Sequence, residues 1–415
     1  MKRNATAIAV QAAGQLALIG AVPILTRVYG PASLGSYQLA TSIALVVQPI
    51  ASRRLEFRIP VEPHGGGAVR QYRSGVLFAA VLSAVLAGGA LAARWQGHPH
   101  LAGTLLMVGT LLFATALAVL DNALLVRDRA FMRLGVRNFV SAVVAVLIQL
   151  AFAWAGGPVV GLAFAILGGR LAGILTTRVA VSSGVAPVPE SASASSRSLT
   201  TTVVTIMAGV VSNSSVYGLT ILTAALASPM ETGQVGTAQR ITSSPVGLIG
   251  QALSQQYQGL ASANVRDGRP VLAPLTRRFV WRIGAVALAL AATMAVLGPI
   301  LATPVLGREW HDAGVVIALL ALPVAMQIAI APTIPLLVML GRERVLLTNQ
   351  LVRLCGGLLA GGIPVLVFHA NYLWMVGGYA LATTAAYLAT LVLTLRVAAA
   401  HDATVRSAAS ARQRS

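Results

Sequence analysis

The stretch from residue 76 to residue 93 reads VLFAAVLSAVLAGGALAA and contains no charged side chain. A helix needs roughly 20 consecutive apolar residues to cross the hydrocarbon core of a membrane. Arg73 precedes the stretch and Arg94 follows it, so both ends can reach water or lipid headgroups. The stretch therefore predicts a transmembrane helix, and comparable runs recur along the whole chain.

The composition makes lipid the solvent of the whole chain. Of 415 residues, 56% are hydrophobic and 10% are charged, and the mean hydropathy is +0.79. A soluble domain carries about 25% charged residues. We therefore expect an all-α membrane protein with about twelve transmembrane helices and only short loops. The expected spans are 5–26, 33–52, 76–93, 101–125, 138–155, 157–177, 199–227, 232–256, 280–301, 314–340, 346–368 and 372–395.

The net charge of +19 comes from residues between the apolar runs rather than from a basic face. With the N-terminus inside, 24 of the 30 basic residues fall in cytoplasmic segments and 3 in outer loops. This bias predicts a bacterial inner-membrane protein with both termini in the cytoplasm. Nucleic acid is not expected as a partner, because no basic surface with interleaved aromatic residues lies outside the spans. The cytoplasmic connection before the fifth span is expected to hold Arg127, Arg129, Arg133 and Arg137.

A short internal repeat predicts two six-helix lobes around a central cavity. Ile24-Leu25-Thr26 is followed by Pro31 and Gly35, and Ile221-Leu222-Thr223 is followed by Pro229 and Gly233. The first copy ends the first span and the second copy ends the seventh. We expect an N-terminal lobe over 1–178, a cytoplasmic linker over 179–198 and a C-terminal lobe over 199–415. Parallel repeats of this kind occur in transporters.

Polar side chains gather in the first, second, seventh and eighth spans. Such side chains are costly against lipid and usually face an interior or a water-filled cavity. The alternative is that Ser, Thr and Gln bond across packed helix interfaces. The candidate substrate-binding residues of this kind are Gln11, Gln15, Gln38, Asn213, Gln239, Ser244, Gln251 and Gln255.

Positive charge within the spans has almost no negative counterpart. Arg170, Arg240 and Arg353 lie in spans, and Arg53 and Arg54 stand at the inner mouth between the second and third spans. A cavity with cations and few anions is expected to receive an anion, and the guanidinium fork suits phosphate. For Arg170 and Arg353, snorkelling to the cytoplasmic interface is an equal alternative.

Among the acidic residues, only Asp121 falls within a predicted span, which makes it the candidate for ion coupling. No catalytic constellation, nucleotide-binding motif or metal-ligand cluster is evident, so we expect neither an enzyme nor a cofactor nor a metal site. The single cysteine, Cys355, excludes a disulfide within the chain.

Four stretches resemble one known family. They are 25–37, LTRVYGPASLGSY; 238–255, with Ala238-Gln239-Arg240 and Gly250-Gln251; 305–310, VLGREW, followed by Ala313-Gly314; and 129–150. They are similar, in order and spacing, to the bacterial oligosaccharide flippases, the Wzx-type branch of the multidrug/oligosaccharidyl-lipid/polysaccharide (MOP) exporter superfamily. The resemblance spans nearly the whole chain.

The resemblance implies two six-helix lobes around a cation-lined cavity, with Arg240 among the cavity cations. It implies that an undecaprenyl-pyrophosphate-linked oligosaccharide, as used for O-antigen or exopolysaccharide, moves from the inner to the outer leaflet. Membrane lipid is a further expected partner, and a glycan polymerase and other assembly proteins are candidate partners. The alternatives are a MATE-like drug antiporter, which would need cavity carboxylates, and a membrane glycan-modifying enzyme.

Overall fold

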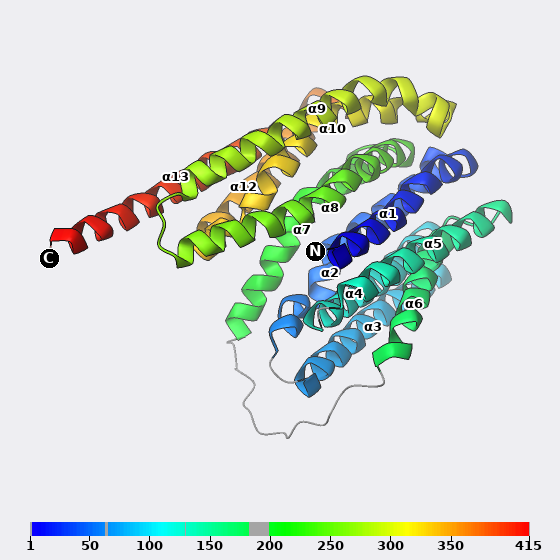
Figure 1. Ribbon diagram of the computed structural model, residues 1–415. Coiled ribbons are helices and arrows are strands. Elements are labelled where there is room, and N and C mark those ends of the chain that lie inside the picture. The colour runs from blue at the N-terminus through cyan, green and yellow to red at the C-terminus, as the bar shows by residue number, and fades with distance from the viewer. Residues whose placement is uncertain (1, 63–64, 129, 182–198, 415) are drawn as a thin grey trace. The chain divides into compact units, whose positions relative to one another are not determined.

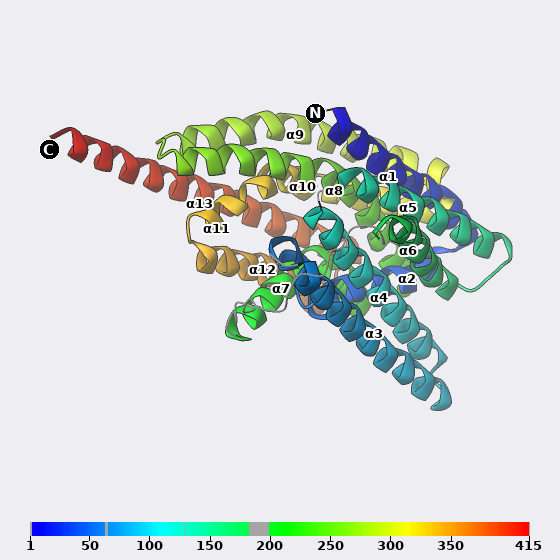
Figure 2. The same cartoon turned by 60° about the horizontal axis from the view of Figure 1, so that its bottom comes forward.

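Apolar runs become long helices because only a helix satisfies its own backbone hydrogen bonds in lipid. A computed structural model describes residues 2–62, 65–128, 130–181 and 199–414, and nearly all of them are helical (Figures 1 and 2). The protein is an all-α, multi-pass membrane protein. Nine of its described helical segments are long and apolar enough to cross a bilayer. The other three predicted spans also form helices, of which two have a shorter apolar stretch and one is strongly polar.

The described helices fall into two compact units. The first unit comprises residues 1–224 and 228–233, and the second comprises residues 225–227 and 234–415. The sequence instead predicts a division at 179–198, most of which lies outside the described residues, so the division into two six-helix lobes stays a prediction. The first unit contains α1 (Lys2–Val28), α2 (Pro31–Ala51), η1 (Leu55–Phe57), η2 (Ile59–Val61), α3 (Gly65–Trp95), α4 (Pro99–Arg127), α5 (Phe131–Trp154), α6 (Val160–Val181) and most of α7 (Leu199–Leu226).

Helix α4 forms the centre of the first unit. It packs against α2, α3 and α6, while α5 packs against α1 and α6. In the apolar stretch of α4, 61% of the residues are buried inside the protein, whereas only 17% are buried in the apolar stretch of α3. The exposed face of α3 carries apolar side chains such as Leu77 and Val85, which lipid must cover.

The second unit repeats this pattern around α10. It contains most of α8 (Pro229–Arg266), and α9 (Leu272–Leu306), η3 (Arg308–Trp310), α10 (His311–Ile330), η4 (Ala331–Thr333), α11 (Pro335–Met339), α12 (Glu343–Phe368) and α13 (Tyr372–Arg414). In the apolar stretch that contains α10, 61% of the residues are buried, as in α4. In the apolar stretch of α9, 17% are buried, as in α3. The predicted tenth span is broken after Ile330, where Pro332 and Pro335 each lack a backbone N–H donor.

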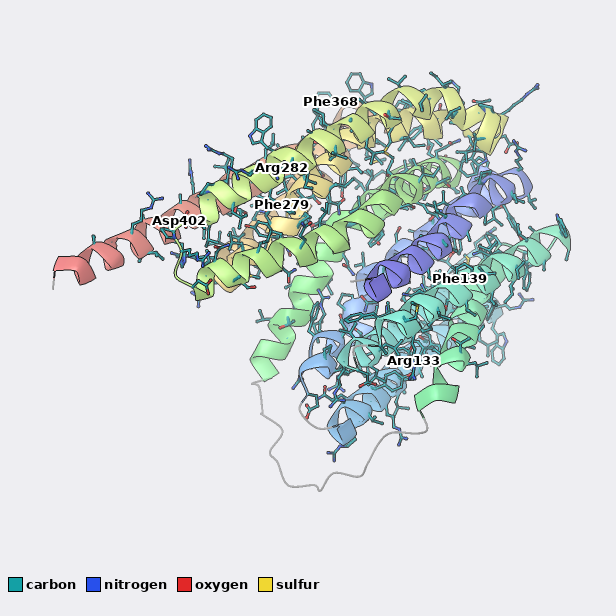
Figure 3. All side chains as sticks on the ribbon, viewed as in Figure 1. Arg133, Phe139, Phe279, Arg282, Phe368 and Asp402 are labelled. Carbon is teal, nitrogen blue, oxygen red and sulfur yellow. The ribbon has the colours of Figure 1, made fainter. Side chains whose placement is uncertain are left out.

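A buried carboxylate fixes the start of α9 to the end of α13. Both oxygens of Asp402 accept backbone N–H groups, from Leu272 and from Ala273, each at 2.9 Å. The first N–H groups of a helix have no partner within the helix, and a negative charge there is favourable. Asp402, labelled in Figure 3, lies in the part of α13 that continues past the predicted end of the twelfth span at 395.

The two copies of the internal repeat have the same local structure and touch each other within the first unit. Helix α2 begins at Pro31 and α8 begins at Pro229, each with proline in the first helical position. A Cβ atom added to Gly35 would collide with the carbonyl oxygen of Pro229, and one added to Gly233 would collide with that of Pro31. The shared Pro-x-x-x-Gly pattern thus permits a reciprocal close approach of two backbones.

We predict that Gly35→Ala destabilises the protein by about 1–3 kcal/mol, because the added methyl group must displace a backbone carbonyl. Thermal unfolding of the purified protein in detergent measures the effect. Gly88→Ala is the matched control, since an added Cβ there meets nothing within 4 Å. Equal melting temperatures for the two variants would contradict the reciprocal contact.

Candidate functional site: a polar cavity in the first unit

A fully buried arginine joins α4 to α5. Arg137 is 1% exposed, and its Nη1 donates to the Asp121 carboxylate and to the Ala118 carbonyl oxygen, the latter at 3.4 Å. Its Nη2 donates to Asn122 Oδ1 and to Asn138 Oδ1, each at 2.7 Å. A guanidinium can lie in an apolar bundle only where a carboxylate and further acceptors compensate its charge.

This arginine corrects the sequence analysis. Arg133 and Arg137 are predicted in a cytoplasmic loop before a span that begins at residue 138, yet α5 begins at Phe131 and includes both. Arg133 is exposed, as expected, but Arg137 faces the interior of the unit. A charged residue considered by itself is expected outside the membrane. Arg137 can be buried because it pairs with Asp121 on another helix.

Next to this pair lies a cavity of about 270 Å³, lined in part by Asn122 and Asn138. Five helices of the first unit line it: α1, α2, α4, α5 and α6. Its apolar wall is formed by Leu18, Leu45, Ala118, Val119, Ala142, Ala145 and Ile166. Its polar wall is formed by Gln15, Gln48, Thr115, Asn122, Asn138, Ser141 and Arg170.

Arg170 is the cation of this cavity. It lies on α6 between Gly169 and Gly173, and a Cβ atom at either glycine would collide with α5 at Ser141. The two glycines therefore bring α6 close to α5 and place Arg170 beside the polar wall. No carboxylate is among the lining residues, and Asp121 is already bound to Arg137.

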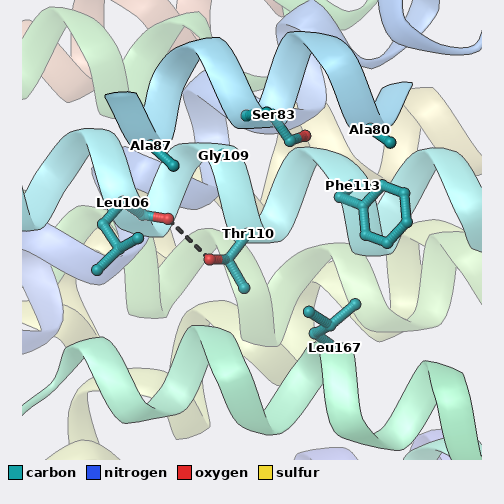
Figure 4. Close-up of a pocket in the computed structure, with 9 residues that line it drawn as sticks. Ala80, Ser83, Ala87, Leu106, Gly109, Thr110, Phe113 and Leu167 are labelled. Carbon is teal, nitrogen blue, oxygen red and sulfur yellow. Dashed lines mark hydrogen bonds between the residues drawn. The ribbon is translucent and has the colours of Figure 1, made fainter. Parts of the chain in front are cut away.

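A second cavity of the same volume, about 270 Å³, lies between α3, α4 and α6 (Figure 4). Its lining is mainly Ala, Leu, Gly and Phe113, and Thr110 Oγ1 donates to the Leu106 carbonyl oxygen at 2.8 Å. The hydroxyl of Thr110 is thus used within its own helix. This cavity offers no charge and is not a candidate for ionic chemistry.

A family profile matches the sequence of this chain, and several solved structures match its fold. Residues 70–315, more than half of the chain, match the profile of a family described as Polysaccharide biosynthesis protein. The chain belongs to this polysaccharide biosynthesis family. No curated protein sequence gives a significant match.

Transporter structures share the fold of this chain. An inward-facing MATE multidrug transporter of the MOP superfamily aligns over 96% of each chain, with 14% identity and a TM-score of 0.66. The lipid II flippase MurJ, in its inward closed conformation, aligns over 92% of this chain and 86% of its own, with 11% identity and a TM-score of 0.68. A eukaryotic MATE transporter, AtDTX14, aligns over 97% of each chain, with 14% identity and a TM-score of 0.60. At these identities the likeness establishes the fold alone.

The two arginines predicted at the inner mouth, Arg53 and Arg54, follow α2 in left-handed conformations, with φ of 52° and 54°. Arg53 Nη1 donates to Ser74 Oγ at 3.1 Å, and its guanidinium lies 5.7 Å from the ring centroid of Phe78. Arg54 pairs with Glu56 at 3.3 Å. Arg54 therefore has its own counter-charge, whereas Arg53 is held by a hydroxyl and an aromatic ring.

Other predicted residues of the first unit make structural contacts. Asn213 on α7 donates from Nδ2 to the Leu45 carbonyl oxygen at 2.7 Å, which ties α7 to α2. Gln38 is buried on α2. The ion-coupling role of Asp121 stays a prediction, although its carboxylate is bound to a guanidinium.

The second unit holds the remaining predicted cations. Arg353 on α12 is 8% exposed, and its guanidinium carbon lies 4.9 Å from the ring centroid of Tyr387 on α13. Arg240, Gln239 and Ser244 lie on α8, where Ser244 Oγ donates to the Arg240 carbonyl oxygen at 2.7 Å. Their grouping with Arg170 in one central cavity stays a prediction. The side chains of Gln11, Gln251 and Gln255 lie outside the described part of the structure.

Sequence reasoning missed Asn122, Asn138, Gln48 and Ser141 as lining residues of the cavity, and Arg137 as the residue that holds two of them. A signal was present for three of them. Asn122 follows Asp121 directly and Asn138 follows Arg137 directly, and Gln48 lies in the polar stripe of the second span. No signal in a single sequence shows that these stretches meet, because the meeting depends on which helices are neighbours.

We predict that Asp121→Asn and Arg137→Gln each destabilise the protein by about 3–5 kcal/mol, because each leaves a buried charge without its partner. The double variant should lose clearly less free energy of unfolding than the two single variants lose together. Chemical denaturation in detergent measures all three, and Arg133→Gln, which alters the exposed arginine on the same helix, is the control (Figure 3). Additive losses would contradict the pairing.

Proposed function

We propose that this protein is a Wzx-type flippase that moves an undecaprenyl-pyrophosphate-linked oligosaccharide from the inner to the outer leaflet by alternating access. Two findings support the class: the polysaccharide biosynthesis family and a fold like that of MATE transporters and a lipid II flippase. The family indicates a glycan, and the fold suits movement across a membrane.

The observation that carries the proposal is the imbalance of charge in the first-unit cavity. Asp121 is used by Arg137, so Arg170 has no carboxylate among the residues that line the cavity. A cation in a largely apolar cavity favours an anionic ligand, which then supplies the missing counter-charge. A pyrophosphate-linked glycan brings both an anion and the hydroxyl groups that amide side chains bind.

The position of the cavity along its helices supports loading from the cytoplasm. Gln48 lies three residues before the end of α2, Asn122 five before the end of α4, and Asn138 seven after the start of α5. The distribution of arginine assigns these helix ends to the cytoplasmic side of a bacterial inner membrane. In this assignment the cavity lies towards the leaflet in which the lipid-linked glycan is assembled.

The second unit would contribute further contacts during transport. Arg240 and Gln239 are half-buried on the polar helix α8 and are proposed as contacts for the pyrophosphate and the sugars. Arg353, held against Tyr387, is a further anion contact. Membrane lipid surrounds the apolar faces, and a glycan polymerase and other assembly proteins are proposed as partners that receive the product.

A MATE-like drug antiporter is the second candidate, because MATE structures share the fold. It would need a carboxylate free to bind a cationic drug, and Asp121 already binds a guanidinium. A membrane glycan-modifying enzyme is the third candidate, and modified glycan from the purified protein without translocation would favour it. Cation efflux that depends on Asp121 would favour the antiporter.

We predict that Arg170→Gln and Arg240→Gln each lower glycan export at least about tenfold, the cost of losing a hydrogen bond to a charged group. Surface glycan is measured in cells whose only flippase for that glycan is the tested variant, at matched protein levels. Arg94→Gln, which alters an exposed arginine in a predicted outer loop, is the control. Export at the wild-type level in both the Arg170→Gln and the Arg240→Gln variant would refute the proposal.

A further inference from the structure

The hydrogen bonds of Arg137 set the orientation of two side-chain amides in the first-unit cavity. Asn122 and Asn138 each turn the Oδ1 atom to Arg137 Nη2. Since the Oδ1 and Nδ2 atoms of an amide point in different directions, neither Nδ2 group faces this arginine. Both residues also line the cavity, so each amide can present its Nδ2 group, a hydrogen-bond donor, to the cavity.

Two further polar groups of this wall lack partners among the described residues. Gln48 is 7% exposed, and its buried Nε2 has no hydrogen-bond acceptor there. Ser141 is 3% exposed, and its buried Oγ is also without a partner. Leaving a buried polar group unsatisfied costs about 1–3 kcal/mol, so each is expected to meet a ligand or water.

The positive charge at the cavity decides whether water or a ligand is the better partner for these groups. The guanidinium of Arg170 adds a cation that only donates hydrogen bonds, and no carboxylate is present among the residues that line the cavity. Water both donates and accepts, and it does not neutralise a charge. A group with several acceptor oxygens and a negative charge matches all of these donors at once.

The size of the cavity excludes a single water molecule as its natural occupant. Its volume is about 270 Å³, whereas one water molecule takes up about 30 Å³ in the liquid. A phosphate group or the carboxylate and ring of an acidic sugar fits this space. The apolar side chains that also line the cavity, such as Leu45 and Ile166, lower the local dielectric and strengthen attraction between the ligand and Arg170.

We propose that this first-unit cavity is a binding site for an oxyanion, held by Arg170, Gln48 Nε2 and the Nδ2 groups of Asn122 and Asn138. Arg137 and Asp121 do not touch the ligand and act as positioning residues. The site accepts the carboxylate of an acidic sugar or a phosphate oxygen, which share the same chemistry. Only its assignment to the transported glycan rests on the proposed flippase function.

The test measures binding directly, without transport. The purified full-length protein in detergent is titrated with sodium glucuronate, inorganic phosphate or glucose at constant ionic strength, and thermal unfolding is followed. We expect both oxyanions to raise the melting temperature in a saturable way and glucose to have no effect. Stronger binding of glucuronate indicates an acidic sugar as the source of the oxyanion, and stronger binding of phosphate indicates the lipid headgroup.

Variants then locate the site. Arg170→Gln should weaken oxyanion binding at least about tenfold, and Gln48→Met, which keeps the side-chain volume, should weaken it severalfold. Arg94→Gln should bind as the wild type does. The second variant keeps the test decisive if Arg170→Gln does not fold. No saturable effect of either oxyanion on the wild type, an equal effect of glucose, or unchanged binding in the folded cavity variants would overturn the proposal.

Binding and export can fail separately. If oxyanions bind through Arg170 while Arg170→Gln exports glycan normally, the site stands and its use by the proposed flippase is refuted. If export depends on Arg170 while the wild type binds no oxyanion, the flippase stands and the site is refuted.

Discussion

The buried ion pair between Arg137 on α5 and Asp121 on α4 is the interaction on which the first unit depends. Taking a guanidinium out of water costs several kcal/mol, and the pair offsets this cost only with additional hydrogen bonds. Asn122 and Asn138 supply them, which fixes the orientation of both amides. The pair also uses the carboxylate of Asp121. Arg170, nearby on α6, is therefore left with a charge that a visiting anion can neutralise.

Glycine and proline let the helices approach closely enough for this arrangement. Gly169 and Gly173 allow α6 to pack tightly on α5, and thereby place Arg170 at the cavity. Gly35 and Gly233 play the same part where the two copies of the repeat meet. In lipid, where apolar surfaces gain little by association, close backbone packing is a main source of helix association. The fold and the site thus both depend on small residues at close helix contacts.

The sequence alone predicts the helices well, because apolar runs and the arginines between them mark each span. All twelve predicted spans contain a helix, and the tenth is broken at Pro332 and Pro335. The sequence also singles out Arg170, because a charged residue inside an apolar run can be recognised without a structure. It misplaces Arg137, which stands at the edge of such a run. The partners of Arg137 lie 15 or more residues away on α4, apart from Asn138 beside it, and only the packing of helices brings them together.

The most direct test of this account is a crystal structure of the protein with arsenate, a phosphate analogue whose arsenic atom is located by anomalous scattering. The account predicts an anomalous peak in the first-unit cavity, within hydrogen-bond distance of the Arg170 guanidinium and Gln48 Nε2, with Arg137 still bound to Asp121. A peak beside Arg137 with Asp121 displaced, or an empty cavity at an arsenate concentration that stabilises the protein, would contradict it.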